Sequence, residues 1–160
     1  DNVHITTDYE AVLAARDVLA ERGIAAEVYS ATSFQQLRHE ALQVERWNQL
    51  HPDKKARIPY VEQVLGSDGG PIIVATDWIK QLPELVSRWV EAPYVVLGTD
   101  GFGRSDYRAK LRRFFEVNRY YVAVAALKAL ADDGEIGPDV VAAAIRKYGI
   151  DAERPDPWTV

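Results

Sequence analysis

The stretch that decides the fold is Val95-Val96-Leu97-Gly98-Thr99-Asp100-Gly101-Phe102-Gly103-Arg104-Ser105-Asp106. It opens on an apolar run typical of a buried strand, and closely spaced glycines then break that run into a turn. A helical pattern from Tyr107 to Phe115 follows directly. Strand, glycine turn and helix is the layout of a loop at the carboxyl edge of a parallel sheet. We expect Gly101 or Gly103 to take a positive φ, and Asp106 or Ser105 to cap the helix.

The same alternation runs along the whole chain. Short apolar runs predict strands near residues 3–7, 26–30, 72–75 and 94–97. Caps and helical periodicity predict helices that begin after Thr7 or Asp8, at Ser33, Tyr60, Pro83, Tyr107, Asn118 and Pro138. The pattern predicts a three-layer α/β domain, with a mainly parallel sheet and helices on both faces. We assign residues 1–150 to this domain and residues 151–160, which are rich in proline, to an irregular tail.

Composition narrows the classes of function. The chain has 160 residues, 48% of them hydrophobic, with a formal net charge of -5 and no cysteine. A net negative charge argues against a nucleic-acid partner, and the absence of cysteine excludes disulfides and thiolate chemistry. No apolar run approaches the roughly 20 residues that span a membrane, so we expect no membrane partner and a cytoplasmic location.

Several motifs resemble one family. The turn Phe102-Gly103-Arg104-Ser105 is similar to the Phe-Gly-x-Ser turn of the transketolase-like, thiamine-diphosphate-dependent family. Residues 97–106 resemble, more narrowly, the carboxyl-terminal domain of the homodimeric decarboxylating component of bacterial pyruvate dehydrogenase complexes. Further stretches agree in the same order along the chain: Tyr29-Ser30-Ala31-Thr32-Ser33-Phe34, Glu45-Arg46-Trp47-Asn48, Leu50-His51-Pro52, Ala75-Thr76-Asp77 and Phe115-Glu116-Val117. The chain departs from the family at Thr6-Thr7-Asp8, where a glycine- and serine-rich turn is usual.

The resemblance implies a transketolase carboxyl-terminal fold, whose small sheet carries one antiparallel strand. It implies a parent homodimer that uses thiamine diphosphate and magnesium, decarboxylates pyruvate and reductively acetylates the lipoyl group of an acyltransferase component. This chain would be the last domain of that longer enzyme, in keeping with its lack of methionine. Its partners would be the other domains, the second subunit and the acyltransferase, and alone it would not catalyse.

We assign no catalytic, cofactor-binding or metal-binding residue within the chain. Asp68-Gly69 and Asp100-Gly101 both lack the leading glycine of the Gly-Asp-Gly motif that the resemblance brings with it. The histidines His4, His39 and His51 show no spacing typical of a metal site. The cofactor of the parent enzyme is therefore expected to bind outside this chain.

The candidate site is a structural or interface loop made of Gly98, Asp100, Gly101, Phe102, Gly103, Arg104, Ser105 and Asp106. Its amides could instead bind an anion. Trp47 and Tyr107 are possible interface anchors beside Phe102, since aromatic side chains dominate binding hot spots, although Trp47 could equally belong to the core. The alternative functions are an autonomous or engineered assembly module on a transketolase-like scaffold, and a small-molecule-binding domain at the carboxyl edge of the sheet.

Overall fold

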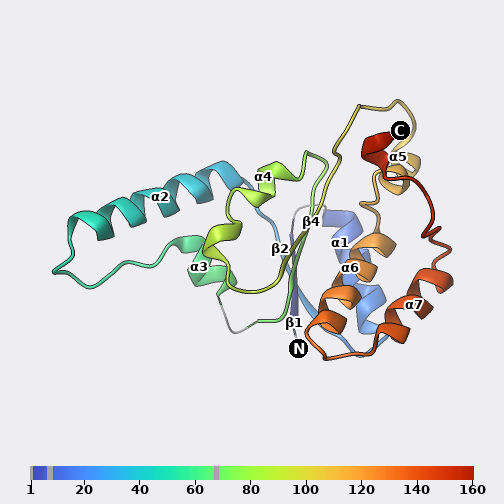
Figure 1. Ribbon diagram of the computed structural model, residues 1–160, viewed down its shortest axis with the longest axis horizontal. Helices are drawn as coiled ribbons and strands as arrows, with labels where there is room; N and C mark the ends of the chain where they lie inside the picture. The colour runs from blue at the N-terminus through green and yellow to red at the C-terminus, as the bar shows by residue number, and fades with distance from the viewer. Residues whose placement is uncertain (1, 7–8, 67–68) are drawn as a thin grey trace.

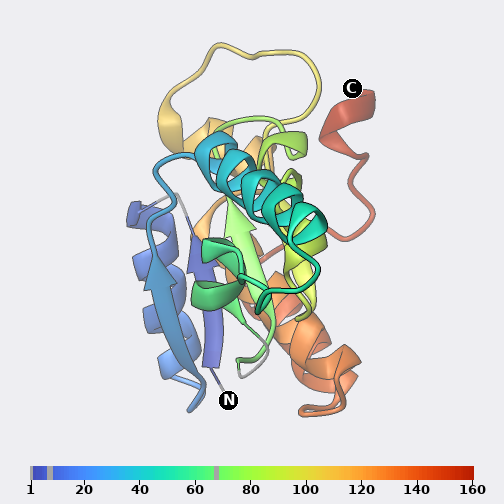
Figure 2. The same ribbon diagram turned by 90° about the vertical axis from the view of Figure 1, so that its left-hand side faces the viewer.

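The computed structural model describes residues 2–6, 9–66 and 69–160, which form a sheet between two layers of helices (Figures 1 and 2). The strands are β1 (Asn2–Thr6), β2 (Ala25–Tyr29), β3 (Ile72–Ala75) and β4 (Tyr94–Leu97). The α-helices are α1 (Tyr9–Ala20), α2 (Phe34–Leu50), α3 (Tyr60–Leu65), α4 (Gln81–Glu84), α5 (Arg108–Phe114), α6 (Arg119–Asp132) and α7 (Pro138–Lys147). Two 3₁₀ turns, η1 (Ser87–Trp89) and η2 (Pro157–Thr159), complete the described elements.

The sheet has the order β2-β1-β3-β4, and every neighbouring pair is parallel. Ile73 in β3 pairs with Ile5 in β1 and with Val95 in β4, which sets the register across the sheet. The antiparallel strand that the family resemblance implies is not found in the described residues. The reason is that the chain after β4 folds into helices α5, α6 and α7, so it adds no further strand.

The central strand β3 supplies both cores. Ile73 and Ala75 face one side of the sheet and Ile72 and Val74 the other, and all four side chains are buried. This alternation is the geometry of a strand, in which successive side chains point to opposite faces. A strand covered on both faces needs such a continuous apolar run, which is why residues 72–75 could be identified from sequence.

Helices cover the two faces unequally (Figure 1). On one face α1, α6 and α7 bury a cluster that includes Leu19 and Leu127, both without exposed surface. On the other face α2, α3 and the α4–η1 segment bury Phe34, Val86 and Trp89. Helix α2 continues well beyond the sheet as a projecting arm (Figure 1). Leu127 and Trp89 are therefore core residues on opposite faces of the sheet.

Most helix boundaries follow their sequence signals. Ser33 caps α2 by accepting a hydrogen bond from the Gln36 amide at 3.2 Å, and Asn118 caps α6 by accepting from the Tyr120 and Tyr121 amides. Gly23 ends the first helical segment with φ +77°. Thr7 and Asp8, the expected cap of α1, lie outside the described residues.

Three local expectations are wrong. The helix expected over residues 83–90 is split into α4 and η1, because the Ser87 hydroxyl donates to the Glu84 carbonyl at 2.8 Å and occupies an acceptor that a continuing helix would use. Strand β4 is half-buried rather than buried, because it lies at the edge of the sheet. Helix α5 has no side-chain cap, because the Asp106 carboxylate accepts from the adjacent Tyr107 amide at 2.8 Å.

Candidate functional site

The glycine loop after β4 is fastened to the loop after β3 at the carboxyl edge of the sheet. The Thr99 amide donates to the Trp78 carbonyl at 2.9 Å, and the Thr99 hydroxyl donates to the Asp77 carbonyl at 2.8 Å. A Cβ at Gly98 would sit 2.7 Å from that same Trp78 carbonyl oxygen. Gly98 is therefore required by the close approach of two backbones.

The next two residues tie the loop to other segments. The Asp100 carboxylate accepts a hydrogen bond from the Lys80 amide at 2.9 Å, which holds the start of α4. Gly101 has φ +94°, and a Cβ there would lie 3.2 Å from the Cα of Trp158 in the tail. The expectation of a positive φ is confirmed at Gly101, whereas Gly103 has no such φ.

The tip of the loop faces solvent. Phe102 is 84% exposed and Tyr107 is 64% exposed, while Gly103, Arg104, Ser105 and Asp106 are exposed as well. Trp78 and Trp158 add exposed indoles from the loop after β3 and from η2. Loop and tail lie together above the carboxyl ends of the strands (Figure 2). We call Trp78, Phe102, Tyr107 and Trp158 the carboxyl-edge aromatics.

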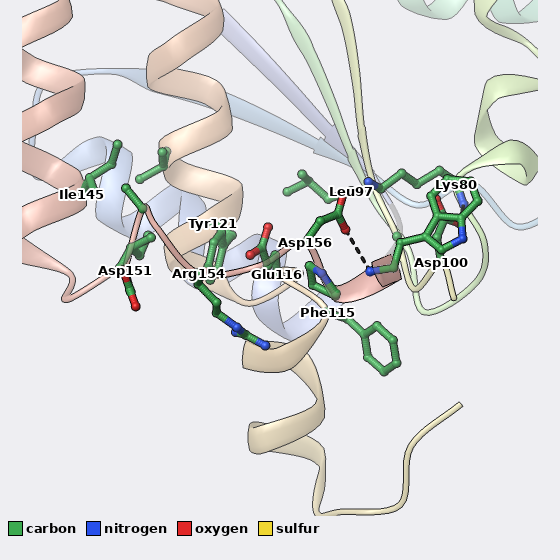
Figure 3. Close-up of a pocket in the computed structure, with 16 residues that line it drawn as sticks. Lys80, Leu97, Asp100, Phe115, Glu116, Tyr121, Ile145, Asp151, Arg154 and Asp156 are labelled. Carbon is green, nitrogen blue, oxygen red and sulfur yellow. Dashed lines mark hydrogen bonds between the residues drawn. The ribbon is translucent and has the colours of Figure 1, made fainter. Parts of the chain in front are cut away.

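A cavity of about 360 Å³ lies beneath this loop, against the tail (Figure 3). Its walls come from the end of β4, the junction between α5 and α6, helix α6 and the tail. Polar groups on one side include Lys80, Glu116 and Arg154, and apolar side chains such as Leu97 and Ile145 line the rest. The cavity brings together segments that are far apart in the sequence.

Glu116 is the unusual residue of this cavity. Its φ of +61° is left-handed, at the position after α5 where glycine is common. The Val117 amide donates to the Arg112 carbonyl at 2.9 Å, which closes the Schellman turn around it. Burial raises the pKa of the Glu116 carboxyl, Arg154 and Lys80 lower it, and Asp156 raises it. In the sequence Glu116 stands out only within the Phe115-Glu116-Val117 stretch of the family resemblance, because a left-handed glutamate has no sequence signal.

Arg154 fastens the tail to α5. Its guanidinium donates to the Arg113 carbonyl at 3.2 Å and to the Phe114 carbonyl at 3.1 Å, and it lies 5.0 Å from the centre of the Phe114 ring. These carbonyls belong to the last turn of α5, where a cation is favourable. The tail therefore forms one wall of the cavity, a contact between residues about 40 positions apart.

Trp47 does not join the carboxyl-edge aromatics. It belongs to the last turn of α2, the helix whose far end projects away from the sheet (Figure 1). Its ring stacks on His51 with centroids 4.4 Å apart, and the Arg57 guanidinium lies 3.8 Å from its centroid. The His51 ring also contacts the Trp47 carbonyl through Nδ1 at 2.8 Å.

The described residues do not fit a magnesium ion. Residues 2–6, 9–66 and 69–160 contain no group of three or more His, Cys, Asp or Glu side chains that could hold a metal ion. Asp100, which precedes a glycine, already accepts the Lys80 amide. We therefore derive no step through thiamine diphosphate within this chain. Among the described helices, none is long and apolar enough to cross a bilayer.

Comparison with known proteins agrees with this geometry. Residues 7–118 match the family described as the transketolase-like TK C-terminal domain. The chain is 57% identical over 136 residues to the pyruvate dehydrogenase E1 component of Pseudomonas aeruginosa, a match that covers 84% of this chain and 15% of the relative. It is 48% identical over 155 residues to the E1 component of Cupriavidus necator, covering 96% of the chain and 17% of the relative. The chain thus spans less than a fifth of these relatives.

A solved structure shares the fold. The chain matches a split gene transketolase, described as an inactive beta4 tetramer, with a TM-score of 0.53 and 18% sequence identity. The match covers 82% of this chain and 39% of the other. At that identity the similarity shows a common α/β architecture and nothing about activity.

Proposed function

The chain belongs to the transketolase-like C-terminal domain family, and from that premise we propose that it is the carboxyl-terminal domain of a pyruvate dehydrogenase decarboxylating component. The observation that carries the proposal is its high identity to such components over most of its length. The whole enzyme would decarboxylate pyruvate and reductively acetylate the lipoyl group of an acyltransferase partner in the cytoplasm. Thiamine diphosphate and magnesium would supply the electron-sink chemistry, held by other domains.

Within that enzyme, this domain supports assembly. Four exposed aromatic side chains at one edge of a sheet are unusual for a surface in permanent contact with water. Aromatic side chains of this kind dominate protein interfaces because they bury much area at little conformational cost. We assign the carboxyl-edge aromatics to contacts with the neighbouring domains or the second subunit.

The test uses the full-length polypeptide that carries this domain. Phe102→Ser with Tyr107→Ser should weaken subunit association, because two exposed anchors are lost, and activity should then fall on dilution. Sedimentation velocity gives the association constant, and pyruvate-dependent acetylation of a lipoyl domain gives the rate.

Leu50→Ser is the matched control, since Leu50 is exposed at the far end of α2. It should leave both measurements unchanged. Equal association and equal rates in the double variant and the parent would overturn the assembly role. A full-length polypeptide that consumes no pyruvate would overturn the enzyme assignment itself.

A further inference from the structure

A second cavity, of about 450 Å³, is lined by other residues of the glycine loop and shares Phe115 with the tail-lined cavity. Three arginines contribute to its lining: Arg104 from the loop, and Arg108 and Arg112 from α5. Asp77 and Thr99, which follow β3 and β4, complete its polar lining together with Asp106. Its volume is in the range of small-molecule sites.

The position of this cavity in the sheet is where ligands of open α/β folds bind. In the order β2-β1-β3-β4, the chain passes from β1 to β2 toward one edge of the sheet and from β3 to β4 toward the other edge. The direction of winding therefore reverses between β1 and β3, which makes this the switch point of the sheet. Asp77 lies two residues after the end of β3. Arg108 and Arg112 reach to 3.9 Å and 3.8 Å of the carboxylate of Glu10 in α1, the helix after β1. The cavity therefore lies outside the carboxyl ends of β3 and β4, and two of its arginines reach toward the helix that follows β1, on the other side of the switch point.

The charges of the cavity favour an anion. The Arg108–Glu10 contact of 3.9 Å is too long for a hydrogen bond, and the Glu10 side chain is 77% exposed. Asp106 is already matched, since it accepts the Tyr107 amide and lies 3.6 Å from the ammonium group of Lys110. Arg112 has only 15% of its side chain exposed and lies 3.8 Å from the Glu10 carboxylate, so its charge is partly balanced and the anion would be held by Arg104 and Arg108.

We propose that this cavity binds a small organic molecule through a phosphate or carboxylate group held by Arg104 and Arg108. The planar guanidinium presents paired donors that match either group, which is why arginine predominates at such sites. Asp77 can accept a hydroxyl or ammonium group from the remainder of the ligand. This site does not depend on the proposed function, because it uses only side chains of this chain.

The test titrates the 160-residue chain with inorganic phosphate and, separately, with malonate, at constant ionic strength. Backbone amide shifts of Thr99, Gly103 and Leu111 report on the lining of the cavity. We expect saturable shifts with a dissociation constant in roughly the millimolar range for a minimal probe. Saturation by phosphate alone identifies a phosphate-bearing ligand, and saturation by malonate alone identifies a carboxylate-bearing one.

Substitutions then localise the binding. Arg104→Gln and Arg108→Gln should each weaken it about tenfold, since each removes charge-assisted hydrogen bonds. Arg108→Lys should bind with an affinity between those of these variants and the parent, because lysine keeps the positive charge but loses the paired donors of the guanidinium. The control Arg16→Gln alters an exposed arginine of α1 that pairs with its neighbour Asp17, and should bind like the parent. Absence of saturation by both probes, or equal binding in all variants, would overturn the site.

Discussion

Gly101 lies directly against Trp158, with only 3.2 Å between the place of a Gly101 Cβ and the Trp158 Cα. This contact joins the glycine loop to the tail across more than fifty residues of sequence. The same loop is fixed to the segment after β3 by Thr99 and Asp100. The carboxyl edge of the sheet is consequently built from three segments that depend on one another.

Replacement of Gly101 should destabilise the domain. Gly101→Val combines a φ of +94° with a steric conflict at Trp158, and we expect a loss of about 1–3 kcal/mol in the free energy of unfolding. Gly103→Val is the matched control, because a Cβ there meets nothing within 4 Å and its φ is ordinary. Urea unfolding measures both. Equal destabilisation by the two substitutions would show that the tail contact is unimportant.

Shortening a core side chain should lower the free energy of unfolding by a larger amount. Leu127 has no exposed surface, between α6 and the sheet, so Leu127→Ala should lower the free energy of unfolding by about 2–5 kcal/mol through lost burial and a cavity. Its neighbour Lys128 is exposed, so Lys128→Ala should change stability by less than about 0.5 kcal/mol. Thermal unfolding of the two variants distinguishes them. A small effect at Leu127 would mean that α6 is oriented differently.

The free energy of unfolding of the domain should depend on pH through the titration of Glu116. Burial raises the pKa of this carboxyl above its ordinary value of 4.5, so the native state holds the proton more tightly than the unfolded chain does. Stability therefore falls as the pH rises from 4.5 through the raised native pKa, because the charged form is disfavoured in the fold. Glu116→Gln removes this titration.

The measurement is the difference in the free energy of unfolding between Glu116→Gln and the parent, as a function of pH. The variant should gain stability relative to the parent as the pH rises through that window, and the difference should then level off. A constant difference, or a parent that gains relative to the variant, would contradict the raised pKa.

The isolated chain should self-associate weakly at high concentration, because the carboxyl-edge aromatics would be covered in a larger assembly. Trp47, which the sequence suggests as an interface anchor, is not part of this surface, because it lies on α2 with its ring between His51 and the Arg57 guanidinium. Sedimentation equilibrium should therefore show a dimer that Phe102→Ser weakens and Trp47→Ser does not. A strict monomer at millimolar concentration would refute the prediction.

The parts of the fold that local chemistry determines could be predicted from sequence. The strand at residues 72–75 can be identified from its continuous hydrophobicity alone, and the cap of α2 can be identified from Ser33 and its spacing to Gln36. The parts that failed depend on distant contacts. The tail-lined cavity requires Arg154 to reach the end of α5, and the placement of Trp47 requires Arg57 to fold back over its ring.

The site itself was only partly predictable for the same reason. The glycine loop is visible because close backbone approach at Gly98 and positive φ at Gly101 demand glycine. The left-handed Glu116 breaks the preference for glycine at that position, so its role became visible only from the backbone. In sequence, Arg112 belongs to a basic run with Lys110 and Arg113 that is typical of a solvated helix face. Only the fold brings Arg104, Arg108 and Arg112 together outside the carboxyl ends of β3 and β4.

The central claim is that this chain is a non-catalytic domain of a thiamine-diphosphate-dependent enzyme. Calorimetric titration of thiamine diphosphate with magnesium into the isolated chain, and into the full-length polypeptide, tests it most directly. The full-length polypeptide should bind with a dissociation constant of roughly micromolar order, about -8 kcal/mol, and the isolated chain should give no saturable heat. Saturable micromolar binding to the isolated chain, or none to the full-length polypeptide, would contradict the account.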